Sequence, residues 1–371
     1  MRVSGAVLEN CEASAPFALS RPVTVGDLEL DPPGPGELLV RVEAAGLCHS
    51  DLSVVNGSRL RPTPMLLGHE AAGIVTELGP GVTDIREGDR VVLTFLPRCG
   101  SCEGCRTEGL LPCIPGTATN TAGVLASGAI RLHRDAPDGS VEQVRHHLGV
   151  SAFATHAVVS RTSVVPVPSD VPPEIAALLG CAVLTGGGAV RNVAQPMPGD
   201  TVAVVGLGGV GMAALLVALA EDHDVIAVDT MAVKRETAMR LGASRALTPD
   251  EAIAEGVRAR TVIEAAGSAR ALETAFALTS PGGCTVTVGL PAPDARAAIA
   301  PLTLTAEART VRGSYLGSSV PERDIPRYVD LWRAGRLPLH ELVSARCELS
   351  DINEAMDRLA SGAELRQLIT F

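Results

Sequence analysis

The stretch VAVVGLGGVGMAALLVALA, residues 202–220, decides the fold of the second half of the chain. A short β-branched run leads into Gly206, Gly208 and Gly211, and an apolar run suited to a helix follows them. Glycines at this spacing permit a tight turn, close approach of a pyrophosphate to the backbone and close helix packing. A second strand, DVIAVD, ends at Asp229, where a carboxylate can hold the hydroxyls of an adenosine ribose. The sequence therefore predicts a dinucleotide-binding site.

The residues around this stretch alternate between short β-branched runs and helical stretches, which predicts βαβ units and a parallel sheet. Residues 1 to about 180 contain short strands separated by Pro/Gly turns such as DPPGPGE, which indicates a β-rich domain. In the second half we expect strands near 201–205, 225–229, 261–264 and 285–289, and helices near 210–220, 232–241 and 269–279.

Composition limits the class of protein and its partners. A chain of 371 residues, 46% of them apolar, is long enough for two domains. The longest uninterrupted apolar run, MAALLVALA, is far shorter than the roughly 20 residues of a membrane span. A net charge of −11 disfavours nucleic acid as a partner. Because the N-terminus lacks an apolar block suited to secretion, we expect a cytoplasmic protein whose nine cysteines serve metal binding or catalysis.

The loop CGSCEGCRTEGLLPC places Cys99, Cys102, Cys105 and Cys113 within 15 residues. Four thiolates that leave no room for water are typical of a structural zinc site. A pair of disulfides and a redox-active CxxC are the alternatives, and a reducing compartment disfavours the disulfides.

Three further motifs contain residues able to bind a metal. They are GLCHSDLS (46–53) with Cys48, LLGHEAAG (66–73) with His69 beside Glu70, and LLGCAVLTGGGAV (178–190) with Cys181. Each cysteine taken alone is more typical of a small buried apolar residue than of a ligand.

The order of these motifs, together with LGVSAFATHAVVS and the terminal LRQLITF, resembles the zinc-dependent alcohol dehydrogenases of the medium-chain dehydrogenase/reductase superfamily. The resemblance covers essentially the whole chain and is to the long NAD-dependent branch with a structural-zinc lobe. It implies an α/β fold, with a doubly wound Rossmann cofactor domain (182–314) inserted into a β-rich GroES-like catalytic domain (1–181 and 315–371). The structural-zinc lobe would span about residues 97–115.

By this resemblance, Cys48, His69 and Cys181 would hold a catalytic zinc whose fourth position is open to water or substrate oxygen. With the four-cysteine loop this makes two zinc ions per chain. Asp51 matches a carboxylate that orients the ligand histidine, and Glu70 matches an acid behind the zinc.

The resemblance also implies the route of the proton and the cofactor contacts. Ser50 matches the hydroxyl that takes the proton from the alcohol. His49 matches a contact to the coenzyme pyrophosphate, although an ordinary exposed loop histidine remains an alternative. An acid at residue 229 repels a 2′-phosphate, which favours NAD over NADP, while the nearby Arg235 argues the other way. The implied cofactor contacts are His49, Thr185, Gly206, Gly208, Gly209, Val210, Gly211, Asp229, Lys234 and Arg366.

The sequence departs from the family pattern at three places. Ser53 stands where many relatives place the histidine that ends the proton relay, so we expect the proton to leave through water or buffer. Gly187 replaces a usual aromatic, which predicts a roomier or more mobile cleft there. Arg59 and Arg61 replace an acidic pair of the class III enzymes, which argues against a glutathione-adduct substrate.

The positions implied to line the substrate pocket are Phe95, His147, Leu148 and Leu290, with His147 as the one polar point unless it faces solvent.

These observations predict an oxidoreductase that transfers a hydride between an alcohol, or its aldehyde or ketone, and NAD. The alternatives are a thiol-adduct formaldehyde dehydrogenase that uses a thiol other than glutathione, a C=C or iminium reductase, and a non-catalytic dinucleotide-binding protein. We expect a small-molecule substrate, no nucleic-acid or membrane partner, and a homodimer or homotetramer.

Overall fold

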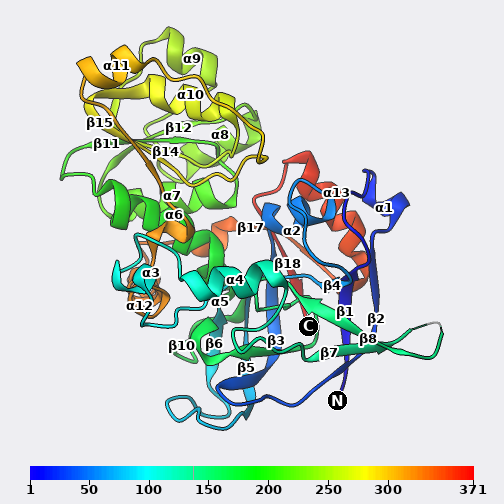
Figure 1. Ribbon diagram of the computed structural model, residues 1–371. Coiled ribbons are helices and arrows are strands. Elements are labelled where there is room, and N and C mark those ends of the chain that lie inside the picture. Colours follow the sequence, from blue (N-terminus) through cyan, green and yellow to red (C-terminus); the bar gives the residue numbers. More distant parts are fainter. Residues whose placement is uncertain (137) are drawn as a thin grey trace. The chain divides into compact units, whose positions relative to one another are not determined.

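The computed structural model describes residues 1–136 and 138–371 (Figure 1). Contacts within the chain divide it into two compact units: unit 1 comprises Met1–Cys181 and Val343–Phe371, and unit 2 comprises Ala182–Leu342. Unit 2 begins where the inserted domain was predicted to begin, but it continues to Leu342 rather than ending at residue 314. It does so because Leu316–Ser318 and the helix Pro321–Arg333 pack against the segment Leu184–Gly188 of the same unit.

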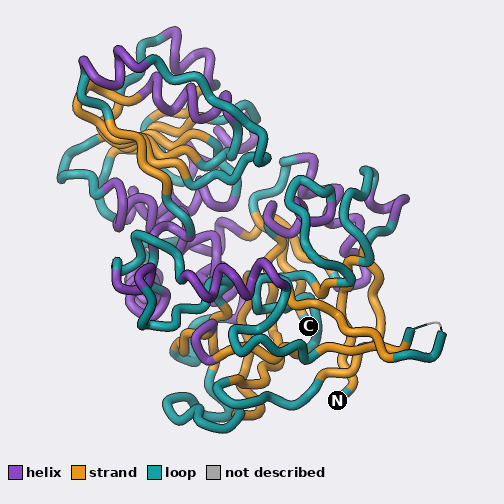
Figure 2. The backbone as a smooth tube through the Cα atoms, viewed as in Figure 1, coloured by secondary structure: helices purple, strands orange, loops and turns teal. Residues whose placement is uncertain are grey.

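Unit 2 contains a six-stranded parallel sheet with helices around it (Figure 2). Its strands are β11 (Thr201–Val205), β12 (Asp224–Val228), β13 (Arg245–Leu247), β14 (Ala259–Glu264), β15 (Thr279–Thr287) and β16 (Thr310–Gly313). Its helices are α6 (Leu184–Gly188), α7 (Gly209–Ala220), α8 (Ala232–Arg240), α9 (Pro249–Ala254), α10 (Ala269–Leu278), α11 (Pro301–Ala306) and α12 (Pro321–Arg333). The strand order β13-β12-β11-β14-β15-β16 is that of a doubly wound dinucleotide-binding fold, which confirms the predicted fold class.

The sheet of unit 2 forms because its central strands are apolar on both faces. Val202, Val204, Val262 and Ile263 are fully buried in β11 and β14, as expected for parallel strands covered by helices on both sides. Helix α7 is apolar around nearly its whole circumference and is buried along most of its length. The change of strand order beside β11 places the following glycine turn at the edge where α/β folds bind ligands.

Unit 1 is built mainly from strands. They are β1 (Arg2–Leu8), β2 (Val23–Leu30), β3 (Glu37–Leu47), β4 (Met65–Leu66), β5 (Glu70–Leu78), β6 (Arg90–Leu93), β7 (Leu132–Asp135), β8 (Val141–His146), β9 (His156–Ser160), β10 (Val164–Val167), β17 (Val343–Cys347) and β18 (Arg366–Thr370). Five of them close into a barrel in the order β1-β2-β7-β8-β4, and the others form a sheet in the order β10-β6-β5-β3-β18-β17, with β9 also paired to β3. Its helices are α1 (Phe17–Ser20), α2 (His49–Val55), α3 (Glu103–Arg106), α4 (Ile114–Ala122), α5 (Pro173–Leu178) and α13 (Ile352–Ser361).

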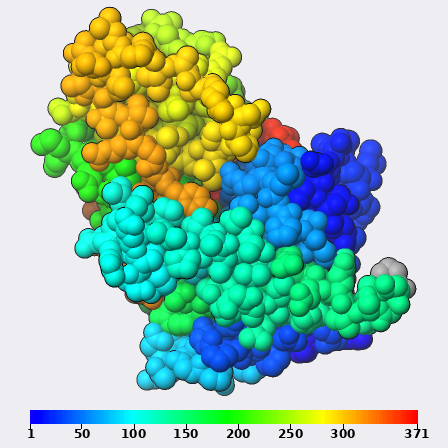
Figure 3. All heavy atoms as spheres, in the orientation of Figure 1, coloured from blue at the N-terminus to red at the C-terminus, as the bar shows by residue number. Residues whose placement is uncertain are grey.

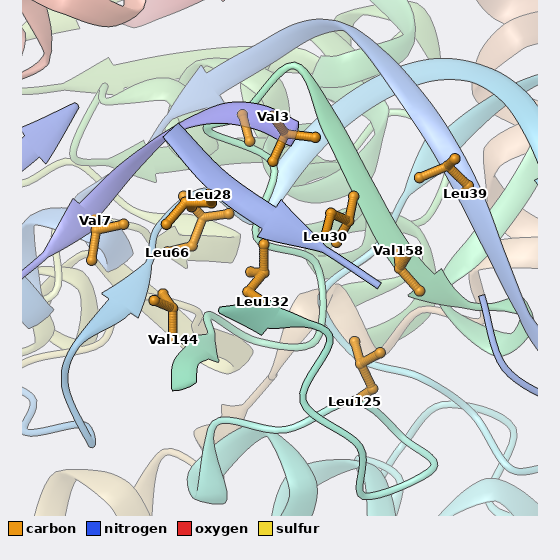
Figure 4. Packing of buried hydrophobic residues seen from close by; sticks show 11 residues of the cluster. Val3, Val7, Leu28, Leu30, Leu39, Leu66, Leu125, Leu132, Val144 and Val158 are labelled. Carbon is orange, nitrogen blue, oxygen red and sulfur yellow. The ribbon is translucent and has the colours of Figure 1, made fainter. Parts of the chain in front are cut away.

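The barrel encloses a buried apolar cluster to which every barrel strand contributes. Val3, Leu28, Leu66, Leu132 and Val144 come from β1, β2, β4, β7 and β8 respectively (Figure 4). The C-terminal strand β18 pairs with β3, which places residues from opposite ends of the chain in one sheet.

One continuous helical segment, Pro173–Ala194, is long and apolar enough to cross a membrane if length and composition alone are considered. Of its most apolar window, 89% is buried inside the protein, which is also how the core helix of a globular fold looks. The segment includes the predicted metal ligand Cys181.

Candidate metal centre and active site

Three side chains that could bind a metal meet in the interior of unit 1. Cys48 directly precedes α2, His69 directly precedes β5, and Cys181 lies in a π-helical turn, Leu179–Val183. Their sulfur atoms and a ring nitrogen of His69 lie within 4.8 Å of one another, and all three residues are buried. Three separate stretches of the sequence are thus brought together at the predicted catalytic metal site.

Asp51 fixes the orientation of His69. The carboxylate is fully buried and accepts hydrogen bonds from the backbone N–H groups of Cys48 and Gly68, both at 3.2 Å. Nδ1 of His69 lies 3.1 Å from the same carboxylate. The three-residue spacing from Cys48 places Asp51 in the first turn of α2, where it completes a capping box. Gly68 has φ 93°, and an added Cβ would lie 2.6 Å from the backbone nitrogen of Phe153, so this turn requires glycine.

The donor set fits a zinc ion. Because Nδ1 of His69 faces Asp51, Nε2 is left to bind a metal, and this buried atom has no hydrogen-bond partner among the described residues. A hydrogen bond with the Cys181 thiol holds the pKa of Cys48 well below its usual value, against the effect of burial, and Arg366 acts in the same direction. The same hydrogen bond raises the pKa of Cys181 well above its usual value. A thiolate, a second sulfur and an imidazole nitrogen are ligands that zinc prefers.

Glu70 and Arg366 form a buried ion pair beside Cys48. Nε and Nη2 of Arg366 each lie 3.1 Å from a Glu70 oxygen, and Nη2 also lies 3.5 Å from the Cys48 sulfur. Burial raises the pKa of Glu70 to about 7, while Arg366 opposes the shift. Gly46 lies opposite Glu70 in the sheet and leaves room for it, because an added Cβ would lie 2.5 Å from its Oε1. Arg366 was predicted to contact a cofactor phosphate, and inside unit 1 its Nε and Nη2 are engaged with Glu70.

The four cysteines of the predicted lobe form a second cluster in unit 1. Their sulfur atoms lie within 4.8 Å of one another. The Cys99–Cys105 and Cys102–Cys113 sulfur pairs are both 3.9 Å apart, close to the roughly 3.8 Å that a tetrahedral zinc with bonds of about 2.3 Å requires. Backbone N–H groups of Cys99, Cys102 and Cys105 donate to sulfurs of the cluster, each at 3.4 Å. All four are free thiols here, so the cluster suits a metal better than the disulfide alternative.

Helix α2 carries the serine predicted to take the alcohol proton and the histidine predicted to contact the coenzyme pyrophosphate. Ser50 is half-buried and His49 is exposed. The hydroxyl of Ser53 donates to the carbonyl of His49 at 2.7 Å, a bond within its own helix. The serine that replaces the usual histidine is thus engaged with backbone.

The side chains predicted to line the substrate pocket are divided between the two units. In unit 1, Phe95 packs edge-on against His69 with ring centroids 5.4 Å apart, and Leu148 is buried. His147 is 1% exposed, so it does not face solvent. Leu290 belongs to unit 2, where it is 46% exposed. His147 also lies 3.0 Å from Asp51, a contact for which no local sequence signal exists.

The glycine turn of unit 2 has the geometry expected for binding a pyrophosphate. Gly206 has φ 91°, and an added Cβ would lie 2.6 Å from the backbone nitrogen of Ala266. An added Cβ on Gly211 would lie 1.8 Å from the carbonyl oxygen of Gly206, so this glycine lets α7 approach the strand. Gly208 caps the start of α7 and has no atom within 4 Å of an added Cβ, which leaves open space above its backbone. Gly209 and Val210 follow as the first residues of α7, whose N-terminal amides suit an anion.

Asp229 lies beside this turn and directly follows β12. Its carboxylate accepts hydrogen bonds from the backbone N–H of Leu207 at 2.7 Å and of Met231 at 2.8 Å. Lys234 is largely buried, and burial lowers its pKa although Asp229 opposes the shift. Nη1 of Arg235 donates to the carbonyl oxygens of Asp229 and Thr230, each at 2.9 Å. The structure thus brings Asp229, Lys234 and the glycine turn together as the sequence predicts.

The three glycines after Thr185 allow α6 to pack closely on several sides. An added Cβ on Gly186 would lie 2.2 Å from the Val210 carbonyl oxygen, and one on Gly187 would lie 2.7 Å from the Tyr328 hydroxyl. The space expected at Gly187 is therefore filled, because Tyr328 of α12 supplies an aromatic ring there. Thr185 itself is 8% exposed in unit 2.

Comparison with known proteins agrees with this geometry. A family model described as the alcohol dehydrogenase GroES-like domain matches residues 34–169, and one described as zinc-binding dehydrogenase matches residues 209–333. An NDMA-dependent alcohol dehydrogenase of Amycolatopsis methanolica is 36% identical over 96% of this chain and 98% of its own length. The crystal structure of benzyl alcohol dehydrogenase from Acinetobacter calcoaceticus is 30% identical, with a TM-score of 0.90 over 100% of this chain and 99% of that one. A cobalt- and zinc-bound thermostable alcohol dehydrogenase from Pyrobaculum aerophilum is 28% identical, with a TM-score of 0.78 over the full length of both chains.

The fold and these matches define an enzyme, an alcohol oxidoreductase of the medium-chain dehydrogenase/reductase type. The chain belongs to the zinc-dependent alcohol dehydrogenase family of that superfamily, with a GroES-like domain and a Rossmann-type domain. Zinc and a nicotinamide cofactor are the groups that this family membership and the cysteine cluster support.

Proposed function

We propose that this enzyme is an NAD-dependent alcohol dehydrogenase with two zinc ions per chain. Cys48, His69 and Cys181 would hold the catalytic zinc, and the four-cysteine cluster would hold the structural one. The observation that carries the proposal concerns Nε2 of His69, which has no hydrogen-bond partner among the residues that the structure describes. The ring lies close to two buried sulfurs while Asp51 holds the opposite ring nitrogen.

Zinc supplies Lewis acidity toward an alcohol oxygen, and NAD supplies the hydride acceptor. The residues of the chain then perform distinct tasks. Asp51 keeps Nε2 of His69 available, and Glu70 with Arg366 holds buried charge next to Cys48. Ser50 takes the proton released from the alcohol hydroxyl.

From Ser50 the proton would leave through water or buffer, because the Ser53 hydroxyl is bonded to the His49 carbonyl. Alcohol oxidation should therefore slow below about pH 8. A relay that ends in a histidine would not slow in this range, because its imidazole would still accept the proton. A Ser53→His variant should oxidise alcohols faster in that range. An unchanged pH–rate profile in this variant would contradict the proposed exit.

NAD is preferred over NADP in this proposal because of Asp229. Its carboxylate would repel a 2′-phosphate, and Nη1 of Arg235 is already engaged with backbone carbonyls. Titration of the protein with each dinucleotide, followed by tryptophan fluorescence, should give the lower Kd for NAD. Tighter binding of NADP would overturn the assignment.

A primary or secondary alcohol is the proposed substrate. Phe95 and Leu148 provide apolar surface near the metal site, and the benzyl alcohol dehydrogenase similarity favours alcohols with an apolar side group. A panel of alcohols and aldehydes should be screened with NAD and, in parallel, with NDMA as acceptor, because a relative is NDMA-dependent. Formaldehyde with a series of thiols should be included, since strictly thiol-dependent NADH formation would instead support the formaldehyde dehydrogenase alternative.

Metal analysis tests the enzyme against a non-catalytic dinucleotide-binding protein. The proposal requires two zinc ions per chain, of which Cys48→Ala removes one together with activity, and Cys102→Ala removes the other. One zinc ion that survives Cys48→Ala would leave only the structural site and sink the catalytic proposal.

We further propose a cytoplasmic homodimer or homotetramer that binds neither nucleic acid nor membranes. Strand β16 lies at the edge of the unit 2 sheet, and its residues are mostly exposed. The neighbouring α11 carries Leu302, which is 80% exposed, and this segment is at the surface in Figure 3 (orange). An unpaired edge strand can pair with the same strand of a second copy. Light scattering at several protein concentrations tests the assembly.

A further inference from the structure

His147 lies against the carboxylate that orients the proposed metal ligand. Its Nδ1 is 3.0 Å from Oδ1 of Asp51, the same oxygen that faces Nδ1 of His69. The rings of His147 and His69 meet edge to face, with centroids 5.4 Å apart and planes at 83°. All three side chains are at most 1% exposed, and both imidazoles contact the carboxylate directly, at 3.1 and 3.0 Å.

The chain holds His147 in this place by a tight turn. Leu148, Gly149 and Ser151 all have positive φ, at 53°, 66° and 52°. A positive φ at a leucine or serine costs free energy and persists only where surrounding contacts impose it. The turn therefore indicates that contacts with the rest of the fold hold His147 in one place.

The contacts that impose this turn connect it to the strand that leads to His69. The buried hydroxyl of Ser151 accepts a hydrogen bond from the backbone N–H of His147 and donates one to the carbonyl oxygen of Leu66, both at 2.8 Å. The backbone N–H of His147 also lies 3.2 Å from that carbonyl. Because Leu66 is three residues before His69, the two imidazoles are held relative to each other through a short, wholly buried set of hydrogen bonds.

Nδ1 of His147 has no well-aligned hydrogen-bond partner among the described residues. Its short contact is to Oδ1 of Asp51, at 3.0 Å. A buried polar atom of this kind is costly unless it is directed at a complementary group. Asp51 is complementary, since its carboxylate is removed from water and otherwise faces two backbone N–H groups and His69.

We infer that His147 is a positioning residue for the metal site, and that it acts through Asp51. By presenting Nδ1 to Oδ1 it would hold the carboxylate in the orientation that keeps Nε2 of His69 turned toward Cys48 and Cys181. This inference rests on the proposed function, because it assumes that those three residues hold a metal. Partners that orient a ligand histidine typically change metal affinity or activity by about 10- to 100-fold when they are removed.

Two substitutions distinguish the role of the His147 Nδ1 atom from the role of its aromatic ring. His147→Phe keeps an aromatic ring against His69 and removes Nδ1. His147→Asn removes the ring but retains a side-chain N–H donor near the position of Nδ1. If His147 served only to fill space, the phenylalanine variant would be the better replacement. If His147 acts through Asp51, the asparagine variant would instead be the better replacement.

The experiment uses full-length protein with cobalt(II) in the catalytic site, so that the visible spectrum reports the ligand geometry. We expect His147→Phe to lose cobalt to a chelator about tenfold faster than the parent protein and to shift its visible bands. We expect His147→Asn to stay within about threefold of the parent, with the parent spectrum. Zinc retained in the four-cysteine cluster serves as the internal control, because general unfolding would release both metals.

The possible outcomes are distinct. Unchanged cobalt loss and spectrum in His147→Phe would overturn the inference, as would an asparagine variant that behaves like the phenylalanine one. If the parent protein binds no metal that depends on Cys48, the proposed function itself fails, and that result is recognisable before any variant is compared.

Discussion

Arg366 and Glu70 are 296 residues apart in sequence, yet they form a two-point ion pair inside unit 1. Arg366 comes from β18 and Glu70 from β5, and both side chains are at most 4% exposed. The guanidinium thus compensates a carboxylate that has no access to water, and it also approaches the sulfur of Cys48. This pairing predicts that the two residues stabilise the folded protein only as a pair.

Arg366→Met should destabilise the protein strongly. At a pH well above the Glu70 pKa of about 7, removal of Arg366 leaves the carboxylate buried and uncompensated, which typically costs about 3–5 kcal/mol. Urea denaturation measures this loss. Adding Glu70→Gln in the same chain should restore much of the stability, because the uncompensated charge is then gone. If Arg366→Met alone is as stable as the parent protein, the ion pair contributes little to the stability of the fold.

Gly208 and Gly211 make a matched pair for testing the dinucleotide turn. Gly208→Ala places a methyl group in open space, so its free energy of unfolding should change little, by about 1 kcal/mol at most. Dinucleotide affinity should fall by at least about tenfold, because that methyl group would occupy the space proposed for the pyrophosphate. Isothermal titration calorimetry with NAD measures the effect.

Gly211→Ala should lower the free energy of unfolding, which Gly208→Ala should leave nearly unchanged. Its Cβ would lie 1.8 Å from the carbonyl oxygen of Gly206, so α7 would have to move and the unit should lose stability. Equal losses of stability in the two variants would mean that Gly208 is needed for folding rather than for the ligand.

The parts of this protein that could be predicted from sequence are those with local requirements. The glycine turn before α7 and the cysteine spacing of the lobe each depend on a few neighbouring residues. The pairing of Arg366 with Glu70 could not be predicted, because it depends on how β18 is placed in the sheet. Tyr328 filling the space at Gly187 is likewise a packing relationship between distant segments that leaves no local signal.

Tyr328 carries a buried hydroxyl without a hydrogen-bond partner among the described residues. The ring is 1% exposed, and burial raises the pKa of the phenol well above its usual value, with Asp324 acting in the same direction. Tyr328→Phe removes the unsatisfied hydroxyl and keeps the ring, so it should leave stability unchanged or raise it by about 1 kcal/mol. Thermal unfolding checks this, and a clear loss would show that the hydroxyl has a partner such as an internal water.

His146 predicts how stability depends on pH. It is 1% exposed, and its Nε2 accepts a hydrogen bond from the backbone N–H of Arg131 at 3.0 Å. Burial, assisted by Arg131 and His133, lowers its pKa to about 3. The folded protein therefore keeps this ring neutral where the unfolded chain, with a pKa near 6.5, takes up a proton. The contribution to stability is complete above about pH 6.5 and declines as the pH falls toward about 3.

The expected size of this effect is about 1.4 kcal/mol per pH unit, or about 2 kcal/mol between pH 6.5 and 5. His146→Gln keeps a side-chain acceptor for the Arg131 N–H but cannot take up a proton. It should therefore lose about 2 kcal/mol less than the parent protein over this interval, measured by urea denaturation at both pH values with equal zinc. His340→Gln is the matched control, because the His340 side chain is 69% exposed and this change should leave the parent pH dependence in place. Parallel losses in the parent and His146→Gln would show that the acid sensitivity arises elsewhere.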